Sequence, residues 1–325
     1  MKILTIKFTP AYISGLVQAD GSFFIGIDRA ANSSLGLRVT PKFILSQHIS
    51  AKPLFEELKL YLNSGYVATN RNEVNYVVGS LPQIKEKILP LIDQYPIRAG
   101  KLNSYLKFKQ VIEMINNKQH LNKEGLAKII DISYGMNLAS SRTQEKKLEL
   151  FKLIGFDKEI SFERLSAPIL PPMNPEFVSG LTDGDGSFFI SFRANGRITP
   201  SFTVIQDSSC KDVLTELKKY FDCGTVYSLK SANAYRFQVE NLEKILNNVI
   251  PHFNNNPLLT EKKTHFEIFS QVCDLLKSNT QKTNDGLLQI IDLAYNMNKE
   301  GKGRRLTKKE FICNIKSKFK SKVTN

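Results

Sequence analysis

The chain has 325 residues, 42% of them hydrophobic and 23% charged, and a formal net charge of +14 at pH 7. A chain of this length and composition can form two domains that each bury a core. The strongly positive charge favours a polyanionic partner, either nucleic acid or an anionic membrane surface. No apolar run is long enough to span a bilayer, and the first residues resemble neither a secretory signal nor a transit peptide.

The four cysteines, Cys210, Cys223, Cys273 and Cys313, lie in the second half of the chain and form no CxxC pair. Reduced thiols in the core are therefore expected, rather than disulfides or a zinc site. The chain is also rich in Lys, Asn and Ile, which AT-rich codons encode. This composition indicates an organellar gene.

Hydrophobic periodicity predicts an ordered set of helices and strands in the first half of the chain. Leu54, Leu58 and Leu62 recur at the four-residue spacing of an amphipathic helix, and apolar–polar alternation after Gly21 is typical of a strand. In chain order the predicted elements are a helix over 10–20, strands over 22–28 and 38–47, a helix over 52–62, a hairpin of strands 65–70 and 75–79, and helices over 81–92, 101–116 and 123–134.

The second half of the chain repeats the first. The segment from Tyr12 to Ile25 returns from Phe177 to Ile190, each time as an apolar stretch that ends in Asp-Gly and continues into an aromatic strand. Further matched pairs follow in the same order: Gln47 with Gln206, Tyr76 with Tyr235, Pro90 with Pro251, Pro96 with Pro257, Lys101 with Lys262, and Ile129-Ile130-Asp131 with Ile290-Ile291-Asp292. The period is too long for a solenoid and indicates a duplicated domain.

This duplication predicts a domain organisation. We expect a first lobe over 1–165, a proline-rich linker over 166–176 and a second lobe over 177–325. Proline fixes the backbone angle φ, so the linker is expected to be semi-rigid. The second lobe ends in a basic tail from Lys299 to Lys322, which is either solvated or in contact with phosphate.

Each repeat carries small residues four apart on one face of its first helix. These are Gly15 and Ala19 in the first repeat, and Gly180 and Gly184 in the second. Small residues at this spacing let two helix backbones approach closely. We therefore expect the two motif helices to pack on each other.

Such packing would bring Asp20 and Asp185 together at the C-terminal ends of the helices. Two carboxylates repel each other there, where the helix ends already carry partial negative charge. Bound divalent cations would remove the conflict, and the main-chain carbonyls of Ala19 and Gly184 could complete the oxygen ligands. An EF-hand at Asp183 is excluded because the loop lacks the later acid that an EF-hand requires.

Both segments resemble the LAGLIDADG motif of homing endonucleases, in the double-motif, single-chain form of the fungal mitochondrial, intron-encoded branch. The resemblance covers the chain from about Tyr12 to Asn298. It implies an α+β fold of two pseudo-symmetric lobes, each α-β-β-α-β-β-α, with paired central motif helices and antiparallel sheets that form a DNA-binding saddle. It also implies a monomeric mitochondrial enzyme that hydrolyses both strands of a DNA duplex across the minor groove, leaving short 3′ overhangs.

The resemblance further implies a divalent metal cofactor. Mg²⁺ is expected, Mn²⁺ is expected to substitute for it, and Ca²⁺ is expected to bind without supporting cleavage. Asp20 and Asp185 are the implied catalytic ligands, each serving one strand, with the carbonyl oxygens of Ala19 and Gly184 beside them. The first repeat has Gln18 where the second has Asp183, so the two halves of the site are not equivalent.

Two further pairs are assigned catalytic roles on the same basis. Gln47 and Gln206 stand where the family places a polar residue at the end of the second strand, and we assign them to positioning water. Lys101 and Lys262 match a basic residue on a later helix, and we assign them to stabilising negative charge at the reacting phosphate.

Strand alternation assigns a mixed polar face to each sheet, and such side chains suit the donors and acceptors of the major groove. The residues predicted to contact DNA are Ser22, Phe24, Asp28, Asn32, Arg38, Thr40, Lys42, Ser46, Asn70, Arg71, Asn72, Asn75, Ser187, Phe189, Ser191, Arg193, Arg197, Thr199, Ser201, Thr203, Tyr227, Lys230, Arg236 and Gln238. Two sheets in line, with strands of roughly ten residues, would span roughly twenty base pairs. Because the two faces differ, the expected target is long and asymmetric.

Three other functions fit parts of the pattern. A group I intron RNA maturase on the same fold, alone or combined with DNA cleavage, would not need the acid pair, and both acids are present. A DNA-binding regulator on a decayed scaffold is expected to have lost an acid or a lysine from these pairs. A membrane-surface protein needs a basic amphipathic helix, and the apolar face of the tail (Phe311, Ile315 and Phe319) is thin. No membrane association is expected.

Overall fold

The computed structural model describes residues 7–136, 142–158, 168–193, 197–297 and 306–313. The chain divides into two compact units, Met1–Gly184 and Asp185–Asn325. Each unit contains a four-stranded antiparallel sheet, and the two sequence repeats have their helices and strands in the same order, although the second motif helix falls in the first unit up to Gly184. The predicted α+β class with two repeated lobes is confirmed. The predicted lobe boundaries stay predictions, and part of the linker lies outside the described residues. No helix in the described ranges has the length and apolar character that crossing a bilayer requires.

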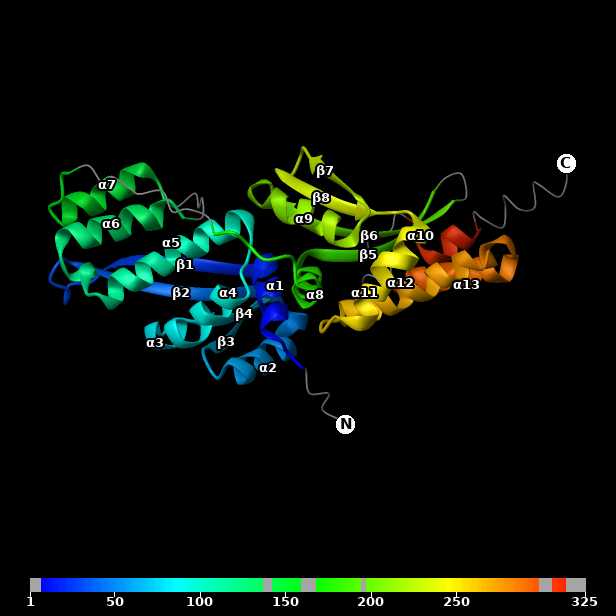
Figure 1. The fold of residues 1–325 in the computed structure, drawn as a ribbon, viewed down its shortest axis with the longest axis horizontal. Coiled ribbons are helices and arrows are strands. Elements are labelled where there is room, and N and C mark those ends of the chain that lie inside the picture. Colours follow the sequence, from blue (N-terminus) through cyan, green and yellow to red (C-terminus); the bar gives the residue numbers. More distant parts are fainter. Residues whose placement is uncertain (1–6, 137–141, 159–167, 194–196, 298–305, 314–325) are drawn as a thin grey trace. The chain divides into compact units, whose positions relative to one another are not determined.

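In the first unit, a helix that carries the repeated motif leads directly into the sheet (Figure 1). Helix α1 (Pro10–Asp20) begins where the Thr9 hydroxyl accepts the main-chain N–H of Tyr12 at 3.3 Å, and a proline at the first helical position has no N–H to satisfy. The sheet has the spatial order β1-β2-β4-β3. Its strands are β1 (Gly21–Arg29), β2 (Leu37–His48), β3 (Tyr66–Asn70) and β4 (Glu73–Val78), with α2 (Lys52–Leu62) between β2 and β3.

Alternation along the strands separates a core face from an open face. On β1, Phe23 and Ile25 are buried, whereas Ser22 and Phe24 are exposed. Phe23 pairs with Phe43 of β2, and its ring lies 5.3 Å from that of Phe108 in α5 (Ala99–Asn116). Helix α5 therefore covers the core face of the sheet, as Figure 1 shows. The opposite face carries most of the residues predicted to contact DNA from this unit, and Asn32, Arg71 and Asn72 lie in turns between its strands.

The helix predicted over 81–92 is interrupted in the structure. It consists of α3 (Leu81–Gln83), a π-helical turn (Ile84–Ile88) and α4 (Leu89–Gln94). The turn lies just before Pro90, which has no N–H and whose ring would clash with the carbonyl four residues earlier, so the helix widens there. The second unit repeats this feature, with a π-helical turn over Ile245–Val249 before Pro251.

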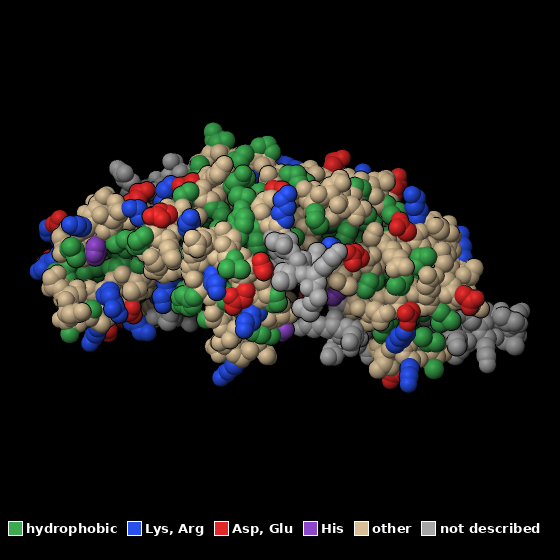
Figure 2. All heavy atoms as spheres, turned by 90° about the horizontal axis from the view of Figure 1, so that it is seen from below, with side chains coloured by type: hydrophobic (Ala, Val, Ile, Leu, Met, Phe, Trp, Pro, Cys, Tyr) green, Lys and Arg blue, Asp and Glu red, His purple; other side chains and the backbone are tan. Residues whose placement is uncertain are grey.

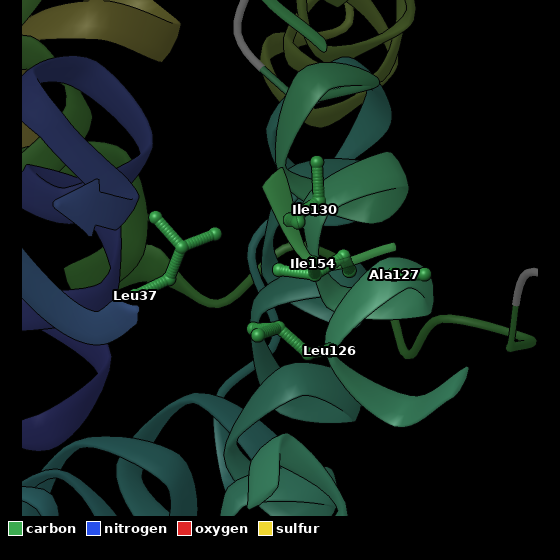
Figure 3. Close-up of a cluster of buried hydrophobic side chains, with 5 residues drawn as sticks. All are labelled: Leu37, Leu126, Ala127, Ile130 and Ile154. Carbon is green, nitrogen blue, oxygen red and sulfur yellow. The ribbon is translucent and has the colours of Figure 1, made fainter. Parts of the chain in front are cut away.

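Helices α6 (Lys123–Tyr134) and α7 (Gln144–Leu153) complete the described part of the first unit before the connector. The sequence pattern does not predict α7, because charged residues dominate it. An ion pair between Lys147 and Asp131 joins it to α6. Figure 3 shows the cluster that holds this region: Leu37 at the start of β2, Leu126, Ala127 and Ile130 of α6, and Ile154 after α7.

The second unit repeats this architecture with the strand order β5-β6-β8-β7. Its elements after the second motif helix, α8 (Pro175–Asp185), are β5 (Gly186–Phe192), β6 (Ile198–Asp207), α9 (Lys211–Phe221), β7 (Thr225–Leu229), β8 (Ala234–Val239), α10 (Leu242–Lys244), α11 (Ile250–Asn255), α12 (Lys262–Lys277) and α13 (Asn284–Tyr295). Its core is aromatic: the ring of Phe188 lies 5.1 to 5.4 Å from those of Phe202, Phe253, Phe266 and Phe269.

All four cysteines are free thiols, as predicted. Cys210 and Cys273 are buried, and burial raises the pKa of the Cys273 thiol. Cys223 is only partly buried and Cys313 is exposed, so the expectation of a core position is wrong for Cys313.

Candidate active site

Within the first unit, helices α1 and α8 pack backbone against backbone. A Cβ atom built on Gly15 would lie 2.0 Å from the carbonyl oxygen of Phe177, and one on Gly180 would lie 2.0 Å from that of Tyr12. No side chain fits into gaps this small, so both positions require glycine. The predicted close packing of the two motif helices is confirmed.

The carboxylate of Asp20, at the end of α1, is held by a glutamine from the sheet. Gln47 on β2 donates from Nε2 to Oδ2 of Asp20 at 2.6 Å. A Cβ atom on Gly184 would lie 2.7 Å from the same oxygen, so the glycine keeps the space beside the acid open. Lys101, in the first turn of α5, donates from Nζ to the carbonyl oxygen of Ala19 at 2.8 Å. The structure therefore brings four predicted site residues of the first repeat together.

The second unit repeats the acid–amide pair. Asp185 ends α8, and its Oδ2 accepts a hydrogen bond from Nε2 of Gln206, a buried residue on β6. Lys262 begins α12, as Lys101 stands in the first turn of α5, and its main-chain N–H donates to the Thr260 hydroxyl at 3.2 Å. The same three residue types thus occupy equivalent elements in both repeats.

The oxygen atoms around Asp20 suit a hard cation better than a soft one. No group of three or more His, Cys, Asp and Glu side chains forms a ligand cluster within the described ranges. The predicted ligands are instead a carboxylate and a main-chain carbonyl from each repeat, which are the donors that Mg²⁺ and Ca²⁺ prefer. The Ala19 carbonyl accepts from Lys101, but a carbonyl oxygen has two lone pairs and can accept a second partner.

The motif position two residues before each catalytic candidate is Gln18 in the first repeat and Asp183 in the second, and these two side chains have different hydrogen-bond partners. Tyr12 donates from Oη to the buried Asp183 carboxylate at 2.6 Å. The pKa of Tyr12 is raised well above its ordinary value, by burial first and then by the charge of Asp183. The bond between Tyr12 and Asp183 joins the two repeats, and the matched pair of residues is Phe177 of the second repeat with Gln18 of the first. Phenylalanine has no hydroxyl to donate, and Gln18 instead accepts the main-chain N–H of Arg98 at 2.7 Å. Sequence reasoning missed this pairing, although the matched exchanges of Tyr for Phe and Asp for Gln signalled it.

The residues predicted to contact DNA from the first sheet are accessible. The exposed ones are Ser22, Phe24, Asp28, Asn32, Arg38, Lys42, Ser46, Asn70, Arg71 and Asn72, and the half-buried ones are Thr40 and Asn75. One basic neighbour was missed by sequence reasoning: the guanidinium carbon of Arg142 lies 4.9 Å from the centre of the Phe24 ring, and its Nη2 donates to the carbonyl oxygen of Ile25 at 2.6 Å.

The predicted contact residues of the second sheet are less open. Arg193, Arg197, Tyr227 and Lys230 are exposed, Ser187, Phe189, Ser191, Arg236 and Gln238 are half-buried, and Thr199, Ser201 and Thr203 are buried. The buried three lie on β6, an inner strand of this sheet. Several of these side chains also bond to Glu240, a residue that sequence reasoning did not select.

On the face that Figure 2 draws, the positive charge is spread rather than gathered in one patch. Figure 2 shows Lys and Arg side chains scattered among Asp and Glu over the face that it draws. Of the predicted basic tail, only residues 306–313 fall within the described residues. There Lys308 forms an ion pair with Asp292 of α13, so its ammonium group already has a partner within the protein.

Known proteins share this architecture. A family model described as LAGLIDADG endonuclease matches residues 13–112 and 178–273. The chain is 36% identical over 272 residues to the probable intron-encoded DNA endonuclease 1 of Mycosarcoma maydis, an alignment that covers 82% of this chain and 99% of that protein.

Two solved structures of DNA complexes are also similar. The LAGLIDADG homing endonuclease I-LtrWI bound to target DNA matches with a TM-score of 0.81 and 29% identity, covering 90% of this chain and 98% of that one. I-GzeII in complex with its DNA target matches with a TM-score of 0.77 and 29% identity, covering 91% and 100%. The duplicated α+β fold, with an aspartate ending each motif helix, is that of the double-motif, single-chain class. This chain belongs to the LAGLIDADG endonuclease family.

Proposed function

We propose that this protein is a site-specific homing endonuclease that cuts both strands of a long, asymmetric DNA duplex and leaves short 3′ overhangs. The observation that carries the proposal is the recurrence of one acid–amide pair in both units, Asp20 with Gln47 and Asp185 with Gln206. A carboxylate at a helix C-terminus is electrostatically unfavourable unless a cation or a donor offsets it. Its occurrence at equivalent places in both repeats supports a common chemical task.

The residues that we propose as metal ligands are Asp20, Asp185 and the main-chain carbonyls of Ala19 and Gly184. All of these donors are oxygen atoms, which fits Mg²⁺, and fits Mn²⁺ as its substitute. When bound, the metal supplies a reactive water at neutral pH and offsets charge on the scissile phosphates. Ca²⁺ accepts the same ligands at longer distances, and we propose that it binds without supporting cleavage.

The other site residues orient and stabilise. Gln47 and Gln206 each donate to one carboxylate oxygen, which fixes the orientation of the acid. The carbonyl oxygen of each amide can accept a hydrogen bond from an attacking water and so orient it. Lys101 and Lys262 provide ammonium groups at the starts of equivalent helices, and we propose that they stabilise negative charge developing at the phosphate.

The open faces of the two sheets are proposed to recognise the DNA in its major groove. Their side chains differ between the units: Asp28 in β1 corresponds to Arg193 after β5 in the repeated sequence. Unequal faces favour an asymmetric target, and the strand lengths suit roughly twenty base pairs. Both halves of the site lie in one chain, so we propose that the active form is a monomer.

An RNA maturase is the less favoured alternative. Assistance to RNA splicing needs no carboxylate–amide pair, yet the pair is present in both repeats. The name of the Mycosarcoma maydis relative describes it as intron-encoded. Together with the Lys-, Asn- and Ile-rich composition, this supports the proposal that the present chain is also encoded in an intron and acts in the mitochondrion.

The proposal is tested by incubating the full-length protein with a library of randomised DNA duplexes in Mg²⁺. Controls are the same reaction with EDTA and with the Asp185→Asn variant. We expect wild-type protein to select and cut one long site, and both controls to leave it uncut. A folded protein that binds nucleic acid but cuts no sequence would contradict the endonuclease and favour the maturase.

A further inference from the structure

Glu240, directly after β8, accepts hydrogen bonds from several polar side chains of the second sheet. Its Oε1 accepts hydrogen bonds from Nε2 of Gln238 at 2.7 Å, from the Ser201 hydroxyl at 3.1 Å and from Nη2 of Arg193 at 3.2 Å. These donors come from β8, from β6 and from the residue that follows β5. One carboxylate oxygen therefore links side chains from adjacent strands.

The network continues through Gln238. Its Oε1 accepts a hydrogen bond from the Tyr227 hydroxyl, which in turn accepts from Nη1 of Arg236 at 3.4 Å. Because the amide nitrogen bonds Glu240 and the amide oxygen bonds Tyr227, only one orientation of this amide satisfies both partners. Glu240 thus determines which way Gln238 presents its donor and its acceptor.

Fold stability does not account for this acid. The side chains of Arg193 and Glu240 are 53% and 40% exposed, and ion pairs this exposed contribute little to folding. A carboxylate on a surface that meets phosphates also lowers affinity for DNA in general. The presence of an acid here is therefore better explained by a role in discriminating between DNA sequences than by a contribution to fold stability or to general affinity for DNA.

The first sheet lacks an acid at the corresponding place. There Gly79 follows β4 beside Lys42, as Glu240 follows β8 beside Ser201. A Cβ atom on Gly79 would meet only the Lys42 side chain, at 3.9 Å, so space does not prevent an acid there. The two sheets therefore differ here in the type of side chain and not in the space available, and of these two positions the acid is found in the second unit alone.

We infer that Glu240 is a specificity-determining residue for the second half of the DNA target, acting by holding Arg193 and Gln238 in one coupled arrangement. This inference rests on the proposed function. Arginine pairs with guanine O6 and N7, and glutamine with adenine N6 and N7. Loss of the Glu240 carboxylate releases both side chains, so preferences at neighbouring base pairs weaken together.

The test begins from the target that wild-type protein selects from a randomised duplex library. Every base pair of this target is replaced singly, and binding is measured for full-length wild type, Glu240→Gln and Glu243→Gln. We expect Glu240→Gln to lose roughly ten-fold discrimination at neighbouring base pairs of one half-site only. It should bind non-target DNA at least as tightly as wild type, because one negative charge is removed. Glu243→Gln removes a charge from α10, outside the network, and should keep the wild-type profile.

A double variant tests the coupling. Arg193→Ala with Glu240→Gln should discriminate no worse than Arg193→Ala alone at the base pair that Arg193 contacts, because Glu240 acts there through Arg193. Unchanged discrimination in folded Glu240→Gln would overturn the inference and leave the endonuclease standing. An equal loss of affinity for every sequence would also overturn it, since it would mark a structural role or a phosphate-positioning one. A wild-type protein that selects no sequence would refute the proposed function, and this inference with it.

Discussion

At the scale of single residues, the three acids of the motif helices have two kinds of environment. Asp20 and Asp185 receive amide donors from the sheets, whereas Asp183 is buried and receives the Tyr12 hydroxyl. The matched position in the first repeat is the neutral Gln18. Each copy of the motif therefore has one acid that we propose as a metal ligand, whereas the residue at the earlier position forms a buried hydrogen bond inside the protein.

Replacing Tyr12 with phenylalanine removes only the hydroxyl that donates to Asp183. A buried carboxylate then loses a donor, so we expect the free energy of unfolding to fall by about 1–3 kcal/mol. Urea denaturation at pH 7 measures this change. Asp183→Asn in the same background should recover part of the loss, because a neutral amide is less costly to bury. Equal stabilities of wild type and Tyr12→Phe would show that the hydrogen bond is unimportant.

His252 predicts a dependence of stability on pH. Burial lowers its pKa from 6.5 to about 4, so between these values the folded protein binds fewer protons than the unfolded chain. The stability from this residue is present above pH 6.5 and is lost as the pH falls through 4. Between pH 7 and 4, wild type should lose on the order of 2–3 kcal/mol more than His252→Gln. Parallel stability curves for the two proteins would refute this assignment.

At the scale of elements, local signals predicted most boundaries. Thr9 and Pro10 begin α1, and alternation outlines β1 and β2. The π-helical turns were missed because hydrophobic periodicity does not show how a proline is accommodated inside a helix. Helix α7 was missed because it depends on tertiary contacts, namely its ion pair and the apolar cluster around Ile154. Glu240 was missed for the same reason, because its partners depend on the register between strands.

The crossing of α1 and α8 gives a sharp prediction. Gly15→Ala places a Cβ atom against the backbone of the other helix, which cannot move aside as a flexible side chain can. We expect a loss of about 3 kcal/mol or more, measured by thermal or urea unfolding. The matched control is Gly135→Ala, where the nearest atom is the mobile Nζ of Lys107 at 3.4 Å, and the expected change is within about 0.5 kcal/mol. Similar effects of both substitutions would contradict the close packing.

At the scale of the whole molecule, duplication without identity is the central property. The two units share their strand order, their acid–amide pairs and their π-helical turns. They differ in the polar faces of their sheets, where Glu240 and its network have no counterpart beside Gly79. The common features support one chemistry performed twice, and the differing faces support recognition of an asymmetric target.

The most direct test of this account is cleavage of a supercoiled plasmid that carries the selected target, in Mg²⁺, by wild type, Asp20→Asn and Asp185→Asn. Each substitution removes one proposed metal ligand while retaining the shape of the side chain. Wild type should give linear DNA, whereas either variant should give none and still bind the target. Linear product at the wild-type rate from either variant would contradict the claim that both repeats supply an essential carboxylate.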